Sequence, residues 1–348
     1  MRHIVEAWLA RLWWQPRPGP MAWMLWPLSL LYRGLARLAW LATGPPVPLP
    51  VPVIVVGNVV VGGVGKTPLV IALVQALRAA GWRPGVISRG HGREAPQADV
   101  IVPVTHASSA REAGDEPLLV HRRTGVPVFV GRRRAQVAVA LAAAHPQVDV
   151  IVSDDGLQHR PLARVAQLIV FDNRGAGNGL LLPAGPLRQP LPRTPERGCF
   201  VVYTGTRLST ALPGRLVPRT AERVLPLEAW QHGGEASAQP LAALRGRRLL
   251  ALAGIGAPAQ FFATLAAAGL DFEPLATGDH ARYAQVPWPA GTAEVVTTEK
   301  DAVKLAALPQ LAGSSTRVWV LPLDCTLPPT LLHELLSVLP RRAEGPPR

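Results

Sequence analysis

The chain has little lysine and little cysteine, and each shortage limits what kind of protein it is. Of its 36 basic residues, only Lys66, Lys300 and Lys304 are lysines, and the others are arginines. A lysine inside a glycine-rich turn is therefore a candidate functional residue. Cys199 and Cys325 form neither a disulfide framework nor a metal-ligand spacing, which favours reduced core cysteines in a cytosolic compartment. The sequence contains no internal repeat, which excludes a repeat architecture.

The charge balance is strongly positive. The formal net charge is +13, which favours an anionic partner such as nucleic acid, anionic lipid or a phosphorylated substrate. A nucleic-acid-binding protein is expected to interleave stacking aromatic side chains with its basic residues. Six of the ten tryptophans instead fall before residue 41, among apolar neighbours. This distribution suits lipid better, and we expect no nucleic-acid partner.

The first 44 residues are predicted to lie on a membrane surface. Residues 4–12 repeat apolar side chains at helical spacing, and a second apolar segment follows. In this second segment Arg33, Arg37 and Pro27 argue against a simple transmembrane span. Tryptophan is favoured at the water–lipid boundary, and arginine suits anionic headgroups. We expect an amphipathic interfacial anchor, peripheral or monotopic. A true span and a helix packed on its own domain are the alternatives.

A strand, a glycine-rich turn and a helix are predicted in succession. Residues 51–57 are rich in β-branched side chains, as in a buried parallel strand, and residues 67–81 show helical apolar spacing. Between them stands G-G-x-G-K-T, although the general phosphate-loop pattern has glycine where this chain has Val60. Such a turn presents backbone N–H groups, a lysine and a threonine hydroxyl to the phosphates and magnesium ion of ATP. The predicted nucleotide-binding residues are Val60, Val61, Gly62, Gly63, Val64, Gly65, Lys66 and Thr67.

An acidic pair ends another predicted strand. Residues 148–152 are apolar, and Asp154 and Asp155 follow at the edge where parallel α/β sheets bind ligands. A phosphate loop needs an acidic partner for Mg²⁺, usually at such a position. Gln158 and His159 follow closely enough to line the same crevice. The sequence therefore predicts a magnesium and nucleotide site here.

Other charged residues have a structural and a functional interpretation. Asp115 and Glu116 precede a predicted helix, where acidic residues often serve only as caps. Arg134 begins another helix and would ordinarily belong to a solvated face. His280 follows an aspartate in a predicted loop, where packing would be its ordinary role. Beside a site for triphosphate, neutralisation of phosphate charge is the better interpretation of Arg134.

Strands alternate with helices again beyond residue 198, which predicts a second α/β layer. The expected fold class is α/β. It comprises a phosphate-loop NTPase core with a parallel sheet, a second smaller α/β domain, and an N-terminal amphipathic membrane-associated helix. We expect an anchor in residues 1–44, the kinase core in residues 45–197, and a C-terminal domain in residues 198–348 that closes over the site.

The chain resembles the tetraacyldisaccharide 4'-kinase family of lipid A biosynthesis from about residue 57 to residue 305. The resemblance is carried by ordered segments: GNVVVGGVGKTP, SRGHGRE, GDEP, DDGLQH, GNGLLLPAGPLR, GIGAP, GDH and TTEKDAVKL. It implies transfer of the γ-phosphate of ATP to the 4'-hydroxyl of a membrane-embedded acylated glucosamine disaccharide 1-phosphate. Since the site needs ATP, the cytoplasmic face of the bacterial inner membrane is the expected location.

The expected mechanism is an in-line phosphoryl transfer, in which positioning and charge neutralisation dominate. Lys66 and the loop amides would hold the outer phosphates. By analogy with the family, Asp115 would take the acceptor proton, tuned by His280. The expected ligands of Mg²⁺ are Thr67, Glu116 and either Asp154 or Asp155. Candidate nucleotide contacts outside the loop are Arg134, His159 and Arg188.

One alternative function remains at this stage. A membrane-associated phosphate-loop ATPase that switches partners would hydrolyse ATP without phosphorylating a lipid. It gives no reason for the segments that contain Asp115 and His280.

Overall fold

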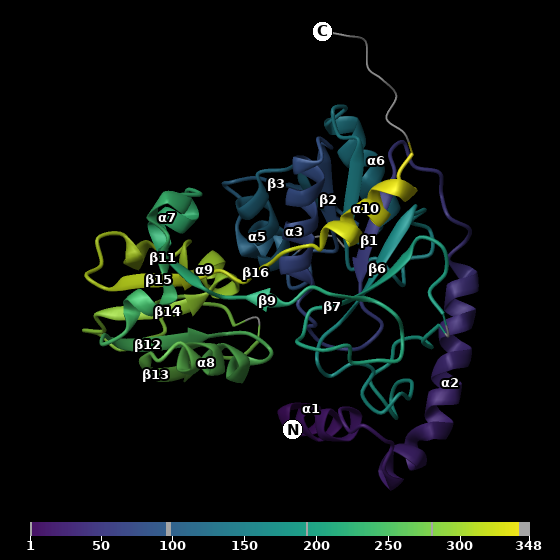
Figure 1. Ribbon diagram of the computed structural model, residues 1–348, viewed down its shortest axis with the longest axis horizontal. Coiled ribbons are helices and arrows are strands. Elements are labelled where there is room, and N and C mark those ends of the chain that lie inside the picture. The colour runs from purple at the N-terminus through teal and green to yellow at the C-terminus, as the bar shows by residue number, and fades with distance from the viewer. Residues whose placement is uncertain (1, 95–98, 193, 280, 341–348) are drawn as a thin grey trace. The chain divides into compact units, whose positions relative to one another are not determined.

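The computed structural model describes residues 2–94, 99–192, 194–279 and 281–340. The chain forms two compact units, each assembled from segments that are distant in the sequence (Figure 1). The first unit comprises Met1–Val86, Arg134–Pro218 and Thr326–Arg348, and the second comprises Ile87–Arg133 and Arg219–Cys325. The fold is α/β, and its sheets are mainly parallel.

The first unit is built on a parallel sheet. Its strands follow the order β2 (Pro84–Ser88), β5 (Val150–Asp154), β1 (Val53–Gly57), β6 (Ala166–Phe171), β7 (Cys199–Tyr203) and β8 (Arg215–Leu216). Every residue of β1 is buried, which explains its uninterrupted apolar sequence. Because β1 pairs in parallel with both β5 and β6, it lies inside the sheet. The helices of this unit include α3 (Lys66–Ala79), α6 (Arg134–Ala144) and α10 (Pro329–Val338).

Two further helices of the first unit stand at the start of the chain, α1 (Arg2–Trp13) and α2 (Pro20–Ala42). In Figure 1, α2 is the long purple helix. It begins with Pro20, whose fixed φ suits a first helical position, and it continues through Pro27. None of the helices among the described residues has the length and apolar character needed to cross a membrane.

The second unit contains a six-stranded sheet. Its order is β11 (Gln239–Pro240), β10 (Arg223–Pro226), β15 (Arg317–Leu321), β14 (Glu294–Thr298), β12 (Arg248–Ala253) and β13 (Asp271–Ala276). The strands from β15 to β13 pair in parallel, and β10 pairs antiparallel with β15. The core on this sheet includes Leu249, Leu265, Val296 and Trp319.

The remaining elements of the second unit are short. Strand β3 (Val102–Val104) pairs antiparallel with β4 (Val128–Val130), and β9 (Arg219–Thr220) pairs antiparallel with β16 (Asp324–Cys325). Helix α5 (Asp115–Thr124) packs against α9 (Glu299–Leu305). The other helices are α4 (Ala110–Ala113), α7 (Leu227–Gln231), α8 (Pro258–Ala267) and the 3₁₀ turns η1 (Glu235–Ser237), η2 (Leu241–Leu244) and η3 (Pro309–Leu311).

The local predictions around the nucleotide site are confirmed. The strand expected in residues 51–57 is β1, and the helix expected in residues 67–81 is α3. The strand expected in residues 148–152 is β5, whose last residue is Asp154. The structure therefore has a strand, a glycine turn and a helix in the order that a phosphate loop requires.

Candidate active site

The phosphate loop, residues 58–67, has four of its carbonyl groups engaged in hydrogen bonds. The Val59 carbonyl accepts from Arg188 N–H at 2.7 Å, and the Val60 carbonyl accepts from the Asn58 side-chain amide at 2.7 Å. The Gly63 carbonyl accepts from the Arg174 guanidinium at 2.6 Å, and the Val64 carbonyl accepts from the Thr204 hydroxyl at 2.8 Å. The first amides of α3 have no acceptor within the helix, as at any helix N-terminus. These four carbonyl oxygens of the loop are thus engaged in hydrogen bonds. The N-terminus of α3 offers backbone N–H donors and a favourable helix dipole to an anion.

Glycine is required at two positions of this loop. Gly62 and Gly65 have φ angles of 86° and 77°, in the left-handed region that other residues rarely adopt. Val60, where the general pattern has glycine, does not need that freedom, because Asp155 is the only non-glycine with positive φ among the described residues. Its side chain is buried, and its backbone forms an isolated bridge with Leu187. The departure from the pattern is therefore compatible with the loop.

Four predicted residues come together beside the loop. The Lys66 ammonium donates to Asn58 Oδ1 at 3.0 Å and lies 3.3 Å from Asp155 Oδ1. The Arg188 guanidinium is 3.8 Å from the other Asp155 oxygen, and Arg134 donates to the Asp155 carbonyl at 3.3 Å. Two positive groups thus lie beside the Asp155 carboxylate, and a third binds the backbone carbonyl of the same residue. Phosphate oxygens are suitable partners for such a group of positive side chains.

Oxygen donors suitable for Mg²⁺ are also present. Asp154 ends β5 beside Val56 of β1, and Thr67 lies in the first turn of α3; both side chains are buried. Within the described residues, no group of three or more His, Cys, Asp or Glu side chains could hold a metal ion. Mg²⁺ is commonly held by one or two carboxylates together with substrate phosphates and waters. The donor set therefore fits an ion that arrives with a nucleotide.

His159 is neutral near pH 7. Burial, with the positive charges of Arg134 and Arg164, lowers its pKa to about 4. The Arg164 guanidinium also donates to the carbonyls of Leu157, His159 and Leu162, at 3.2, 2.7 and 3.2 Å. This arginine therefore fixes the loop that follows Asp155.

Asp115 and Glu116 begin α5 in the second unit. Asp115 is buried, and Gly114 before it has a φ of 91°. Glu116 forms an ion pair with Lys300 of α9. Burial opposes the charge of Lys300, but the carboxylates of Glu116, Asp115 and Asp279 outweigh it and raise the pKa of the lysine. Residues from GDEP, GDH and TTEKDAVKL are therefore neighbours within this unit, whereas His280 lies outside the described residues.

A buried ion pair joins α5 to α9. The Arg123 guanidinium donates to Glu299 Oε1 at 2.6 Å, and Trp230 Nε1 donates to the same oxygen at 3.0 Å. Arg123 also binds Asp324 of β16. These contacts fix the helix that carries Asp115.

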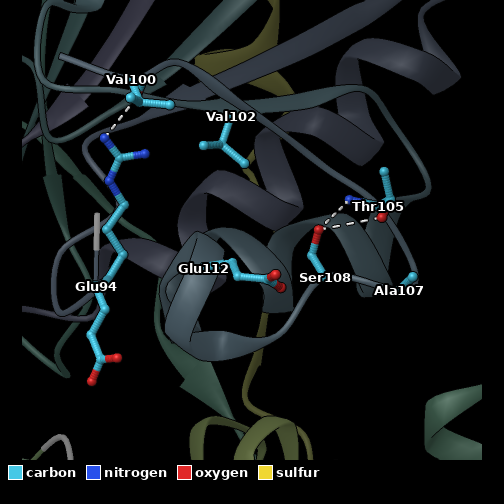
Figure 2. Close-up of a pocket in the computed structure, with 8 residues that line it drawn as sticks. Glu94, Val100, Val102, Thr105, Ala107, Ser108 and Glu112 are labelled. Carbon is cyan, nitrogen blue, oxygen red and sulfur yellow. Dashed lines mark hydrogen bonds between the residues drawn. The ribbon is translucent and has the colours of Figure 1, made fainter. Parts of the chain in front are cut away.

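The second unit also has a pocket of 390 Å³, shown in Figure 2. Its lining comprises Arg93, Glu94, Val100, Val102, Thr105, Ala107, Ser108 and Glu112. Arg93, from SRGHGRE, donates to the Val100 carbonyl at 2.8 Å, the dashed line beside Val100 in Figure 2. The guanidinium is thus engaged by its own loop.

A family model described as tetraacyldisaccharide-1-P 4'-kinase matches residues 21–340. The chain belongs to this family. A tetraacyldisaccharide 4'-kinase from Methylibium petroleiphilum is 48% identical over 99% of this chain and 97% of its own length. One from Leptothrix cholodnii is 50% identical over 93% of this chain and 94% of its own length. The resemblance predicted from the ordered segments is therefore confirmed, and the protein is a kinase.

A solved structure of the tetraacyldisaccharide-1-P 4'-kinase family is similar along most of the chain. It is the crystal structure of the "apo" form of LpxK from Aquifex aeolicus in complex with ATP. The TM-score is 0.73 with 26% identity, and the match covers 92% of this chain and 99% of that one. Similarity to this family thus extends from sequence to fold.

The sequence interpretation missed several residues that support the predicted groups within each unit. They are Asn58, Arg164, Arg174, Thr204 and Lys300, which hold carbonyls of the loops or neutralise carboxylates. Lys300 could have been found from the rarity of lysine. The others carry no local signal, since their partners are set by the tertiary fold.

Proposed function

We infer that this kinase transfers the γ-phosphate of ATP to the 4'-hydroxyl of an acylated glucosamine disaccharide 1-phosphate, a step of lipid A biosynthesis. The observation that carries this function is the phosphate loop with Lys66 at its end, in a chain that matches the family model over residues 21–340. Sequence relatives named for the same substrate support the choice of acceptor.

The reaction forms a bond between the 4'-oxygen and the γ-phosphorus while the bond from that phosphorus to the β,γ-bridging oxygen breaks. The leaving ADP takes the electron pair, and the hydroxyl proton passes to a base. We assign Lys66 and the amides of residues 62–67 to the β- and γ-phosphates, where they neutralise charge. Arg134, His159 and Arg188 are the further nucleotide contacts that we propose. The positive side chains around Asp155 support this assignment.

We propose that Thr67, with Asp154 or Asp155, holds Mg²⁺, and that Glu116 is a further ligand. When bound, the ion supplies charge neutralisation for the phosphates. The buried hydroxyl and carboxylate in the first unit support this role. In this structure the Glu116 carboxylate forms an ion pair with Lys300.

Asp115 is proposed as the base that takes the acceptor proton, with His280 as its partner. A histidine–carboxylate pair suits proton transfer near neutrality. The charges of Asp115 and Asp279 both raise the pKa of Lys300. Asp279 directly precedes His280 in the sequence, which supports the pairing of His280 with Asp115.

We propose that α1 and α2 bind the cytoplasmic face of the bacterial inner membrane as a peripheral or monotopic anchor. Helix α2 buries Ala22 and Ser29 but leaves large apolar side chains in solvent. The exposed ones on α2 are Met21, Trp23, Met24, Trp26, Leu28, Leu30, Leu31, Leu35, Leu38, Trp40 and Leu41. Arg33 and Arg37, also exposed, suit anionic headgroups. Such an apolar surface is typical of a protein that binds lipid.

By role, we divide the chain into the anchor in residues 1–44, the phosphate-loop core in residues 45–197, and a smaller C-terminal domain in residues 198–348. The anchor would recruit the enzyme to a lipid acceptor, and the core would hold ATP. This division assigns functions to stretches of sequence and is independent of the two compact units described above.

The test mixes purified protein with ATP, Mg²⁺ and a lipid disaccharide 1-phosphate in detergent, and follows the lipid by mass spectrometry. We expect a bisphosphate product that requires all three. Hydrolysis of ATP at one rate with or without acceptor, and no bisphosphate, would favour the partner-switching ATPase instead.

A further inference from the structure

One segment of the first unit, Asp172–Arg188, contacts both N-terminal helices and the phosphate loop. We call it the bridging segment. It contains the whole of GNGLLLPAGPLR, residues 177–188, a stretch to which the proposed reaction assigns only Arg188. Its contacts on the two sides differ in kind.

On the helix side, side chains of the helices bind backbone groups of the bridging segment. Ser29 donates to the Leu181 carbonyl at 2.8 Å, and Tyr32 donates to the Arg188 carbonyl at 2.9 Å. Trp13, at the end of α1, donates to the Pro183 carbonyl at 2.8 Å. Gly177 allows this close approach, because a Cβ there would lie 2.2 Å from the Trp13 carbonyl oxygen.

On the loop side, the bridging segment binds the backbone of the phosphate loop. Arg188 N–H donates to the Val59 carbonyl at 2.7 Å, and Val61 N–H donates to the Pro186 carbonyl at 2.9 Å. The Arg174 guanidinium donates to the Gly63 carbonyl at 2.6 Å. The contacts thus reach the loop near its start, at Val59 and Val61, and in its middle, at Gly63.

Two arginines contact both sides at once. The Arg188 carbonyl accepts from Tyr32 while its own N–H binds Val59, so the backbone of one residue links α2 to the loop. The Arg174 guanidinium stacks on the Trp14 ring, 4.2 Å from its centroid, directly after α1. Asp172 orients this guanidinium through a 2.6 Å hydrogen bond. Each helix therefore has a short path to the loop.

We propose that these contacts couple docking of α1 and α2 on a lipid surface to ATP binding at the phosphate loop, with Tyr32 and Arg174 as positioning residues. The inference rests on the proposed function, since it needs both the lipid-bound helices and the nucleotide in the loop. A lipid surface fixes helices whose apolar side chains otherwise face water. The fixed helices restrict the bridging segment and, through it, the phosphate loop. Because the loop is then already partly ordered, the protein loses less conformational entropy when ATP binds.

Coupling of this kind is reciprocal. If lipid raises the affinity for nucleotide by some factor, nucleotide raises the affinity for lipid by the same factor. A purely mechanical anchor changes neither quantity. The two binding constants therefore distinguish coupling from simple recruitment.

The experiment uses the full chain, a fluorescent ATP analogue with Mg²⁺, and vesicles of phosphatidylethanolamine and phosphatidylglycerol. With saturating vesicles we expect the Kd for nucleotide to fall about 5-fold or more, the lower end of typical couplings. Vesicle binding should strengthen equally when nucleotide saturates the protein. An unchanged Kd for protein bound to vesicles would overturn the proposal.

Three variants locate the coupling. Tyr32→Phe removes one donor but keeps the ring, and Trp14→Leu removes the surface beneath Arg174. We define the coupling ratio as the nucleotide Kd without vesicles divided by the Kd with saturating vesicles. Each variant should lower this ratio to about half of the wild-type value or less, and the double variant should bring it to about 1. Met24→Ala is the control, because Met24 is 72% exposed on the same helix. Met24→Ala should weaken vesicle binding, but once vesicles saturate the protein it should give the wild-type ratio of nucleotide Kd values.

The outcomes separate this inference from the proposed function. Wild-type ratios in the folded Tyr32→Phe and Trp14→Leu proteins, checked by thermal melting, would overturn the coupling. The same preparations are assayed for bisphosphate in detergent. Bisphosphate formed with an unchanged Kd would reject the coupling alone. A vesicle-dependent Kd without any bisphosphate would support the coupling and reject the kinase reaction with this acceptor.

Discussion

The Lys66 ammonium lies 3.3 Å from Asp155 Oδ1, although the two residues are far apart in the sequence. The Lys66 side chain is 12% exposed and that of Asp155 is 37% exposed. A second contact, to Asn58 Oδ1, holds the ammonium at the start of the loop. The lysine side chain is thus positioned before any phosphate arrives, so this side chain itself needs little reorientation when ATP binds.

Lys66→Ala is expected to lower turnover by about 10²–10³-fold, the usual cost of removing one positioned group that stabilises transition-state charge. The measurement is bisphosphate formation at saturating ATP. Arg78→Ala is the matched control, because it removes an exposed positive charge from the same helix. Near-normal turnover in a folded Lys66→Ala protein would contradict the phosphate-loop assignment.

Asp115→Ala is expected to lower the maximal rate by a factor on the order of 10²–10⁴, as for a positioned proton acceptor. His280→Ala should cost less, and the double variant should be little worse than Asp115→Ala, because residues that act as a unit are not additive. The measurement is a double-mutant cycle in turnover, with thermal stability recorded. A cap would instead cost roughly 1 kcal/mol of stability and leave the rate nearly unchanged. Fully additive losses would argue against the pair.

His159 predicts a pH dependence of stability. Its pKa is about 4 in the folded protein, below the ordinary value of 6.5, chiefly because of burial. Between these two values the unfolded chain binds a proton that the folded chain does not, so stability falls as pH falls from about 6.5 to about 4. After allowance for solvent screening, the loss is on the order of 1 kcal/mol.

The measurement for His159 is the free energy of unfolding at several pH values, in wild type and in His159→Gln. We expect the difference between the two curves to change in this window and to be constant above pH 7. A pH-independent difference would show that the histidine is protonated equally in both states.

Arg123→Ala is expected to destabilise the protein by about 3–5 kcal/mol, because it leaves the buried Glu299 carboxylate without its positively charged partner. Both side chains are less than a tenth exposed. The matched control is Arg215→Ala, which breaks the exposed pair with Glu334 and should cost about 0–1 kcal/mol. Denaturant unfolding measures both, and equal losses would contradict the role given to burial.

The local parts of the site could be predicted from sequence. The phosphate loop is a strand, a turn and a helix in succession, so residues 51–81 contain the whole pattern, and the end of β5 at Asp154 follows from a short apolar run. Contacts between distant segments could not be predicted. Arg123 and Glu299 are 176 positions apart, and no periodicity relates them. The association of residues 87–133 with residues 219–325 depends on such contacts.

The surroundings of the phosphate loop were hidden for the same reason. Arg174 and Thr204 stand in stretches that read as loop or strand end, and their partners Gly63 and Val64 are more than a hundred residues earlier. Hydrogen bonds from a side chain to a distant carbonyl leave no pattern in sequence. Asn58 was within the quoted motif, but its two bonds back to the loop depend on the turn it helps to form.

The scarcity of lysine has a practical consequence for chemical labelling. Each of the three ε-amines is engaged by a carboxylate: Lys66 by Asp155, Lys300 by Glu116 and Lys304 by Asp301. Acylating reagents that target side-chain amines therefore have no freely solvated lysine to modify. Slow modification of Lys66 would report directly on the phosphate loop, and that of Lys300 on the start of α5. Amine acylation followed by peptide mapping thus becomes a selective footprint of the two places where the chemistry is proposed.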